Sequence, residues 1–234
     1  PRSRLIPSAG NLHDVAGVGA GVNSIEFFFD PACPFAWLTS RWVTEVAEQS
    51  DLQVRWRFIA LKILNEGKDV PEQYARGHAA SFEMLRVVAA VSDDLGNDAV
   101  AALYTALGTA LHTDGGSAEL FGGDDVDPGP VIDAALVAAG LPESYRKATI
   151  DDARDSLIRS ETELALSRTG PDVGTPILTF DLEHPETSTF FGPVINRIPR
   201  GAEALQLWDA LATLARIPGV SELKRSLRGE LDFS

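Results

Sequence analysis

Cys33, the single cysteine of this 234-residue chain, is the residue best suited to covalent chemistry. It follows an apolar, strand-like run (25–29) and the turn-forming pair Asp30-Pro31, and it precedes Pro34 and a segment with helical periodicity. A thiol at the start of a helix lies in the positive field of the helix N-terminus, which favours the thiolate that attacks electrophiles. We therefore expect the pKa of Cys33 to lie below the free-thiol value of about 8.5, in the roughly 3.5–7.5 range of activated cysteines.

Ala36 stands three residues after Cys33, where a Cys-x-x-Cys site would have its second sulfur. An adduct on Cys33 therefore cannot be resolved from position 36, and a second, external thiol must do it. A free cysteine is also commonly a small, inert, buried residue. The Asp-Pro-Ala-Cys-Pro context and a later Gly-Thr-Pro motif favour the nucleophile over that interpretation.

The composition excludes several classes of partner. The formal net charge of -14, from 20 Lys and Arg against 34 Asp and Glu, argues against nucleic acid and against an anionic membrane surface. No run approaches the ~20 apolar residues of a membrane span. A lone cysteine rules out an intrachain disulfide framework and predicts a reducing, cytoplasmic setting.

No metal site is predicted. The loop with Asp124, Asp125 and Asp127 lacks the spacing of a calcium loop, so we interpret it as a solvated loop. His112 has no second ligand at helical spacing, and we interpret it as the end of a helix that faces the active-site cleft.

The order of elements predicts the fold. Residues 24–60 indicate strand, helix and strand, a right-handed parallel crossover, and two short strands return at 177–180 and 189–191 before a last helix. We expect an α/β fold, a thioredoxin-like β-α-β / β-β-α sheet with a large all-helical insertion. The predicted boundaries are a mobile N-terminal tail at 1–23, a thioredoxin-like domain at 24–70 and 170–234, and a helical insertion at 71–169.

A second motif, Gly174-Thr175-Pro176, comes directly before the third predicted strand. Only about 5–6% of X-Pro bonds are cis in folded proteins. In thioredoxin-like folds, however, a cis-proline at this point lies beside the active thiol, so we predict a cis bond between Thr175 and Pro176.

Longer motifs carry a resemblance to a known family. The string from Phe29 to Trp42 is similar to the active-site start of DsbA-like proteins of actinobacteria and, more narrowly, the chain resembles the mycothiol-dependent nitroreductase family. The resemblance runs from about Glu26 to Arg225. Its further motifs are residues 61–66 (LKILNE), 71–74 (PEQY), 172–176 (DVGTP), 190–194 (FFGPV), 198–201 (IPRG) and 207–209 (LWD).

The resemblance implies a cytosolic enzyme in which mycothiol, a low-molecular-weight thiol, supplies electrons. The family typically carries Cys-Pro-Trp-Cys where this chain has Cys33-Pro34-Phe35-Ala36. It implies that Cys33 is the nucleophile and that Pro34, Phe35, Thr175 and Pro176 surround the thiol substrate. It also places Asn65 and Tyr74 beside the thiol, although a cap role for Asn65 and a packing role for Tyr74 remain open.

We therefore expect a monothiol thiol-disulfide oxidoreductase that uses mycothiol or another low-molecular-weight thiol and an electrophilic or disulfide substrate, as a monomer or homodimer. One alternative is a thiol transferase or isomerase of the same fold, in which Cys33 or Ser40 orients the thiol without redox turnover. Another is a non-enzymatic ligand-binding protein with an inert Cys33.

Overall fold

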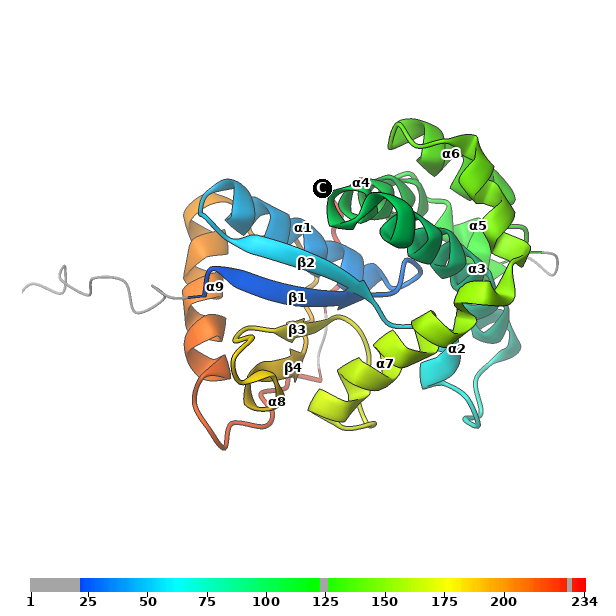
Figure 1. Ribbon diagram of the computed structural model, residues 1–234. Helices are drawn as coiled ribbons and strands as arrows, with labels where there is room; N and C mark the ends of the chain where they lie inside the picture. Colours follow the sequence, from blue (N-terminus) through cyan, green and yellow to red (C-terminus); the bar gives the residue numbers. More distant parts are fainter. Residues whose placement is uncertain (1–21, 123–125, 227–228) are drawn as a thin grey trace, which may run out of the picture.

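The computed structural model describes residues 22–122, 126–226 and 229–234. Most of the predicted N-terminal tail, and Asp124 and Asp125 of the acidic loop, lie outside the described residues. A four-stranded sheet of order β2-β1-β3-β4 forms the centre of the molecule (Figure 1). Strand β1 (Ser24–Phe29) pairs in parallel with β2 (Gln53–Phe58) and antiparallel with β3 (Ile177–Thr179), which pairs antiparallel with β4 (Thr189–Phe191).

The strands confirm the predicted thioredoxin-like sheet, because β1 and β3 are neighbours although the whole helical block separates them in sequence. Both faces of β1 are covered, which explains its unbroken apolar run. Phe27 and Phe29 belong to the core cluster that contains helix α1 (Pro34–Glu48), while Phe28 packs in a second cluster with helix α7 (Asp155–Thr169).

The helices form two groups. Helix α1 and helix α9 (Gly201–Ala215) pack together on one face of the sheet, where the Trp42 indole N–H donates to the carbonyl of Ala204 at 3.0 Å. The remaining elements follow β2 or β3 along the chain. They are α2 (Leu61–Leu64), α3 (Glu72–Leu95), α4 (Asn97–Gly108), the π-helical turn η1 (Thr109–Thr113), α5 (Ser117–Gly122), α6 (Gly129–Ala138), the 3₁₀ segments η2 (Glu143–Ile150) and η3 (Asp152–Arg154), and α8 (Pro185–Ser188).

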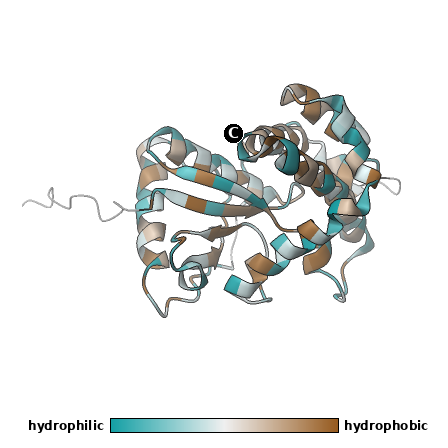
Figure 2. Cartoon of the chain, in the orientation of Figure 1, coloured by the Kyte–Doolittle hydropathy of each residue, from teal (hydrophilic) through white to brown (hydrophobic). Residues whose placement is uncertain are grey.

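The helical insertion shares its core with the sheet. Tyr104 of α4 stacks on Phe29 of β1, with ring centroids 3.7 Å apart. A Cβ added to Gly108 would overlap the Trp37 ring, so α4 approaches α1 as closely as a glycine permits. Figure 2 shows the corresponding hydrophobic stretches on β1 and on α4. This packing produces a DsbA-like thioredoxin fold in which the insertion and the sheet form one structure.

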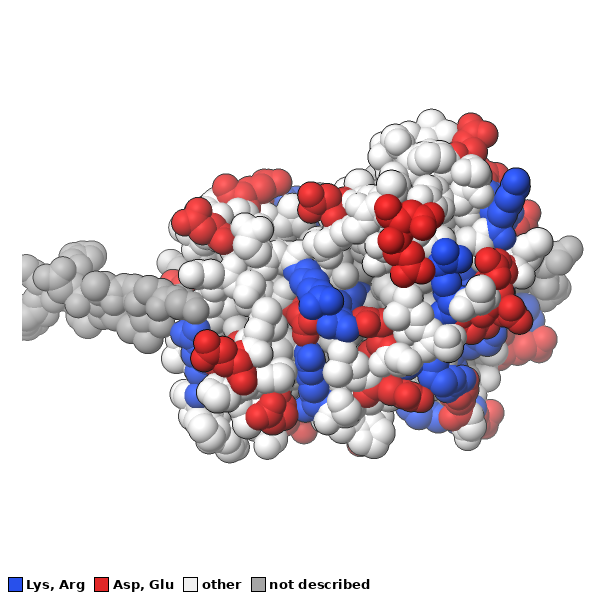
Figure 3. All heavy atoms as spheres, in the orientation of Figure 1, with Lys and Arg blue, Asp and Glu red and all other residues white. Residues whose placement is uncertain are grey.

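Charged side chains of both signs are interspersed on the face shown in Figure 3. No helix within the described ranges is long and apolar enough to cross a membrane.

One buried carboxylate ties the sheet to α7. Glu26 of β1, 5% exposed, accepts hydrogen bonds from Arg57 of β2 and from Arg168 of α7, and Arg57 also pairs with Glu161. Burial alone would raise the pKa of Glu26, but the bonds from Arg168 and Arg57 outweigh it and lower the pKa.

We expect Glu26→Gln to destabilise the protein by about 3 kcal/mol at pH 7, because it leaves two partly buried arginines without their shared charge. Since the folded pKa of Glu26 is lowered, its contribution is present above the ordinary glutamate pKa of about 4.3 and is lost as the pH falls through the folded value. Denaturant unfolding of both proteins from pH 7 to pH 3 measures this. If the difference in unfolding free energy between the two proteins stays constant down to pH 3, the ionised Glu26 does not stabilise the fold in the way described.

Candidate functional site

Cys33 occupies the N-cap of α1, directly after the loop that leaves β1. Its backbone is extended (φ -86, ψ 112), its N–H donates to the Asp30 carbonyl at 3.0 Å, and Pro34 begins the helix. The Cys33 Sγ accepts a hydrogen bond from the Ala36 N–H at 3.4 Å. The helix therefore presents a free backbone donor to the sulfur, as predicted, and Pro34 is already part of it.

The second predicted motif lies opposite the sulfur. The Thr175-Pro176 bond is cis, as predicted, and the Cys33 thiol donates to the Thr175 carbonyl at 3.3 Å. The Thr175 hydroxyl donates to the Phe28 carbonyl at 3.3 Å. Strand β1 therefore fixes the position of Thr175, whose own carbonyl accepts from the Cys33 thiol. A second cis bond, Gly192-Pro193, was not anticipated.

The expectation of a lowered pKa for the Cys33 thiol is wrong for this structure, in which the thiol is buried; this buried arrangement is called closed below. Cys33 is buried, and burial raises the pKa of its thiol to about 12, further assisted by the negative charge of Asp30. The hydrogen bond from Ala36 lowers the pKa but does not outweigh burial. The helix N-terminus is present as predicted, but the extent of burial depends on segments far away in sequence.

Asp30 connects the active-site loop with the helical insertion. Its side chain accepts hydrogen bonds from the Ala32 N–H at 2.9 Å, from the Leu61 N–H at 2.7 Å and from the Ser81 hydroxyl of α3. Burial raises the pKa of this carboxyl, whereas the three hydrogen bonds oppose that rise. The sequence indicated only a turn at Asp30. A single acidic residue directly after the three consecutive phenylalanines of β1 was the available signal for a buried carboxylate.

We expect Asp30→Asn to lower the pKa of Cys33, because it removes a buried negative charge beside the thiol. Alkylation of the wild-type thiol should rise about tenfold per pH unit between about pH 6 and pH 8, since only the thiolate reacts. In the variant, the same rate should be reached at lower pH.

Ser81→Ala is the matched control, because it removes one hydrogen bond from Asp30 and keeps the charge. An equal shift of the alkylation pH profile in both variants would show that the position of the loop, and not the charge of Asp30, controls the pKa of the Cys33 thiol.

His112 lies in the π-helical turn η1, where it continues the end of α4 as predicted. Its buried ring contacts the active-site loop through Nε2, 2.9 Å from the Pro31 carbonyl, and stacks on Trp37 with centroids 6.3 Å apart. Burial lowers the pKa of His112 to about 4, so the ring is neutral and Nε2–H is the donor to the carbonyl. A π-helical turn has no distinct sequence periodicity, which is why this contact was missed.

Two other predicted site residues, Asn65 and Tyr74, make their contacts with residues other than Cys33. Asn65 caps α2 and donates to the Leu61 carbonyl at 3.0 Å, and Tyr74 is 46% exposed and lies beside His78 and Phe121. Among the described residues, no hydrogen bond or ring contact joins either of them to Cys33. Their pocket roles stay predictions.

Phe35 is partly buried against the main core. The Ser40 hydroxyl donates to the Trp37 carbonyl at 2.6 Å and accepts from Arg41. Ser40 is therefore engaged within α1 and does not contact the sulfur. In the described ranges no group of three or more His, Cys, Asp or Glu could hold a metal ion.

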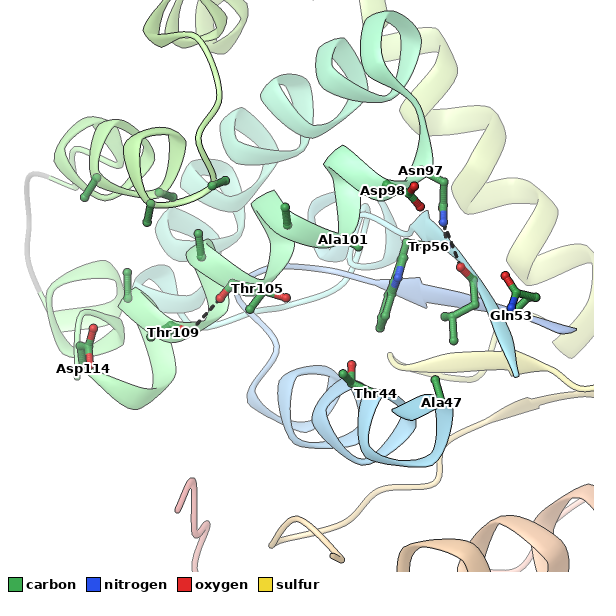
Figure 4. A pocket seen from close by; sticks show the side chains of 18 of the residues that line it. Thr44, Ala47, Gln53, Trp56, Asn97, Asp98, Ala101, Thr105, Thr109 and Asp114 are labelled. Atoms are coloured by element: carbon green, nitrogen blue, oxygen red, sulfur yellow. Dashed lines mark hydrogen bonds between the residues drawn. The ribbon is translucent and has the colours of Figure 1, made fainter. Parts of the chain in front are cut away.

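A groove of about 820 Å³ lies between α1, β2, α4 and α6, beside the C-terminal half of α1 (Figure 4). Several of its polar groups already form hydrogen bonds within the protein. Thr105 accepts from Arg41, Thr109 donates to the Thr105 carbonyl, and Asn97 bonds to both Trp56 N–H and the Val54 carbonyl on the outer edge of β2. Cys33 is not among the residues that line the groove. Thr105, Thr109 and Asn97 stabilise the fold through these hydrogen bonds.

Comparisons with known proteins identify the family of this chain. A family model described as "Rv2466c-like: Mycothiol-dependent nitroreductase Rv2466c" matches residues 32–225. A protein of Mycobacterium tuberculosis (strain ATCC 25618 / H37Rv), named "Uncharacterized protein Rv2286c", is 29% identical over 205 residues, which cover 87% of this chain and 82% of that protein.

Two solved structures are similar at low identity. A probable DsbA oxidoreductase, SCO1869, from Streptomyces coelicolor has a TM-score of 0.49 and 15% identity, and the match covers 87% of this chain and 94% of that one. DsbL from Salmonella enterica serovar Typhimurium has a TM-score of 0.45 and 16% identity, and the match covers 90% and 100%. Because the family model spans well over half of the sequence, the chain belongs to the Rv2466c-like family of mycothiol-dependent nitroreductases, and it carries a single cysteine.

Proposed function

We propose that the protein is a monothiol oxidoreductase in which Cys33 exchanges disulfides with mycothiol or a similar low-molecular-weight thiol. The observation that carries the proposal is the setting of the single sulfur. It lies between the Ala36 N–H and the Thr175 carbonyl, and an alanine stands where a resolving cysteine would be. Family membership supports the choice of mycothiol.

The reaction proceeds in two exchanges. In the first, the Cys33 thiol loses its proton to solvent, and the thiolate attacks a mixed disulfide of substrate and mycothiol. A Cys33–mycothiol disulfide forms, and the substrate leaves as a thiolate that takes up a proton. In the second, a mycothiol thiolate attacks the adduct, Cys33 is released and protonated, and mycothiol disulfide leaves. The net result is that one mixed disulfide and one mycothiol become one substrate thiol and one mycothiol disulfide.

Two groups of this chain assist these steps. The Ala36 N–H stabilises the Cys33 thiolate both when it attacks and when it is released. The backbone beside Thr175 and Pro176 faces the sulfur and is suited to hold an extended thiol substrate. The unpaired thiol supports a cytoplasmic setting.

The dependence of the second exchange on external thiol tests the proposal. Under single-turnover conditions, decay of the Cys33 adduct should be first order in mycothiol and should stop when mycothiol is withheld. An adduct that decays at the same rate without any added thiol would overturn the monothiol route.

One observation favours a second candidate, a thiol transferase or isomerase without redox turnover. In the closed structure the Cys33 thiol is protonated and donates to the Thr175 carbonyl, an arrangement that can orient a ligand without attacking it. Isomerisation or conjugation of a thiol-bearing substrate by a protein that reduces no disulfide would establish this candidate. If Cys33 is alkylated slowly in the presence of every ligand tested and no turnover is found, the protein is a non-enzymatic ligand-binding protein.

A further inference from the structure

The C-terminal residues 229–234, called the strap below, return to the body of the protein. The Asp232 N–H donates to the Asn196 carbonyl at 2.8 Å, and the Asn196 side chain donates to the Glu230 carbonyl at 3.3 Å. Leu231 and Phe233 pack against the main core cluster. The strap is therefore attached to the segment between β4 and α9, and it lies beyond residue 225, where the family match ends.

The strap also contacts the helical insertion next to the active-site loop. The Phe233 ring stacks on His112 with centroids 5.9 Å apart and planes 24° apart. His112 in turn stacks on Trp37 and donates to the Pro31 carbonyl, two residues before Cys33. A continuous series of contacts thus joins the end of the chain to the loop that carries the thiol.

His112 depends on this series for its position. Its ring donates a hydrogen bond to the Pro31 carbonyl, and it stacks on the rings of Trp37 and Phe233. The neutral ring makes no ion pair that would hold it in place. Loss of the Phe233 ring would therefore remove the stacking contact between His112 and the strap, on the same ring that bonds to the active-site loop.

We propose that the strap is an intramolecular latch that holds η1 against the active-site loop, so that Cys33 becomes reactive when the strap detaches. Within the part of the chain that the structure describes, the strap is held by two hydrogen bonds to Asn196 and by two partly buried apolar side chains. Such a small attachment belongs to the segments that open locally, without global unfolding. The latch deepens the proposed function and rests on it only in treating Cys33 as the reacting group.

The thiol itself reports the opening. In the closed structure, with a thiol pKa of about 12, only about one thiol in ten thousand is ionised at pH 8. In an opened molecule the ordinary pKa of about 8.5 gives roughly a quarter. Alkylation of Cys33 by iodoacetamide at pH 8 therefore measures how often the active-site loop opens.

We expect Phe233→Ala to accelerate this alkylation about threefold to tenfold, the factor that corresponds to the loss of one aromatic pair. Phe233→Tyr keeps the ring and should react at the wild-type rate. Leu223→Ala, at a position 87% exposed and outside the strap, should also leave the rate unchanged.

The urea dependence of alkylation separates local from global opening. Acceleration in Phe233→Ala that is independent of low urea concentrations supports the latch. A rate equal to that of the wild type, or one that rises with urea as steeply as global unfolding does, overturns it. The assay uses iodoacetamide and not mycothiol, so it distinguishes the two proposals. If the proposed function is wrong but the latch is right, Phe233→Ala is still alkylated faster than the wild type. If the latch is wrong but the proposed function is right, the wild type still exchanges disulfides with mycothiol.

Discussion

Replacing Cys33 with serine should lower thiol-dependent reduction of a mycothiol mixed disulfide by at least about a thousandfold, because a serine hydroxyl is almost never ionised near neutral pH. The fold should be retained. A serine Oγ at the N-cap of α1 can accept from the Ala36 N–H and donate to the Thr175 carbonyl, as the sulfur does. The comparison requires steady-state rates and thermal unfolding of both proteins. A variant that keeps its rate would show that the chemistry does not pass through this sulfur.

Ala36→Cys should change the fate of the Cys33 adduct. Position 36 is where the helix directs a backbone N–H at the sulfur at 3.4 Å, so a thiol placed there lies within reach of the adduct. The new thiolate should attack Cys33, release one mycothiol as a thiol and leave an internal disulfide. The adduct should then disappear without any added mycothiol. Because Ala36 is fully buried, the extra sulfur should also cost about 1–3 kcal/mol of stability.

The double variant Cys33→Ser with Ala36→Cys is the matched control, because it has one thiol and cannot close a disulfide. Mass spectrometry under mild oxidation should show a loss of two hydrogens in Ala36→Cys alone. Two free thiols in that variant after oxidation would mean that the first turn of α1 does not have the geometry described here.

Much of the fold follows from local patterns. The apolar run of β1, the helical stripe of α1 and the short strands β3 and β4 are each dictated by residues close in sequence, and together they allow few topologies. The cis bond before Pro176 was also predicted, because its place before β3 is set by the fold. These features position Cys33 between a helix N-terminus and a cis-proline.

The electrostatics of the site could not be obtained in this way. The pKa of Cys33 depends on burial by segments distant in sequence and on the charge of Asp30, which Leu61 and Ser81 hold in place. The helix N-terminus alone predicted the opposite direction. The contact between His112 and Pro31 was likewise hidden, because it joins a π-helical turn to a loop.

The central claim is that Cys33 forms a disulfide with mycothiol that this chain cannot resolve alone. Intact-mass analysis after incubation with mycothiol disulfide tests it most directly, with peptide mapping to locate the adduct. We expect one mycothiol per chain, on Cys33, stable until free thiol is added. A protein that remains unmodified under conditions in which its denatured form reacts fully would contradict the account.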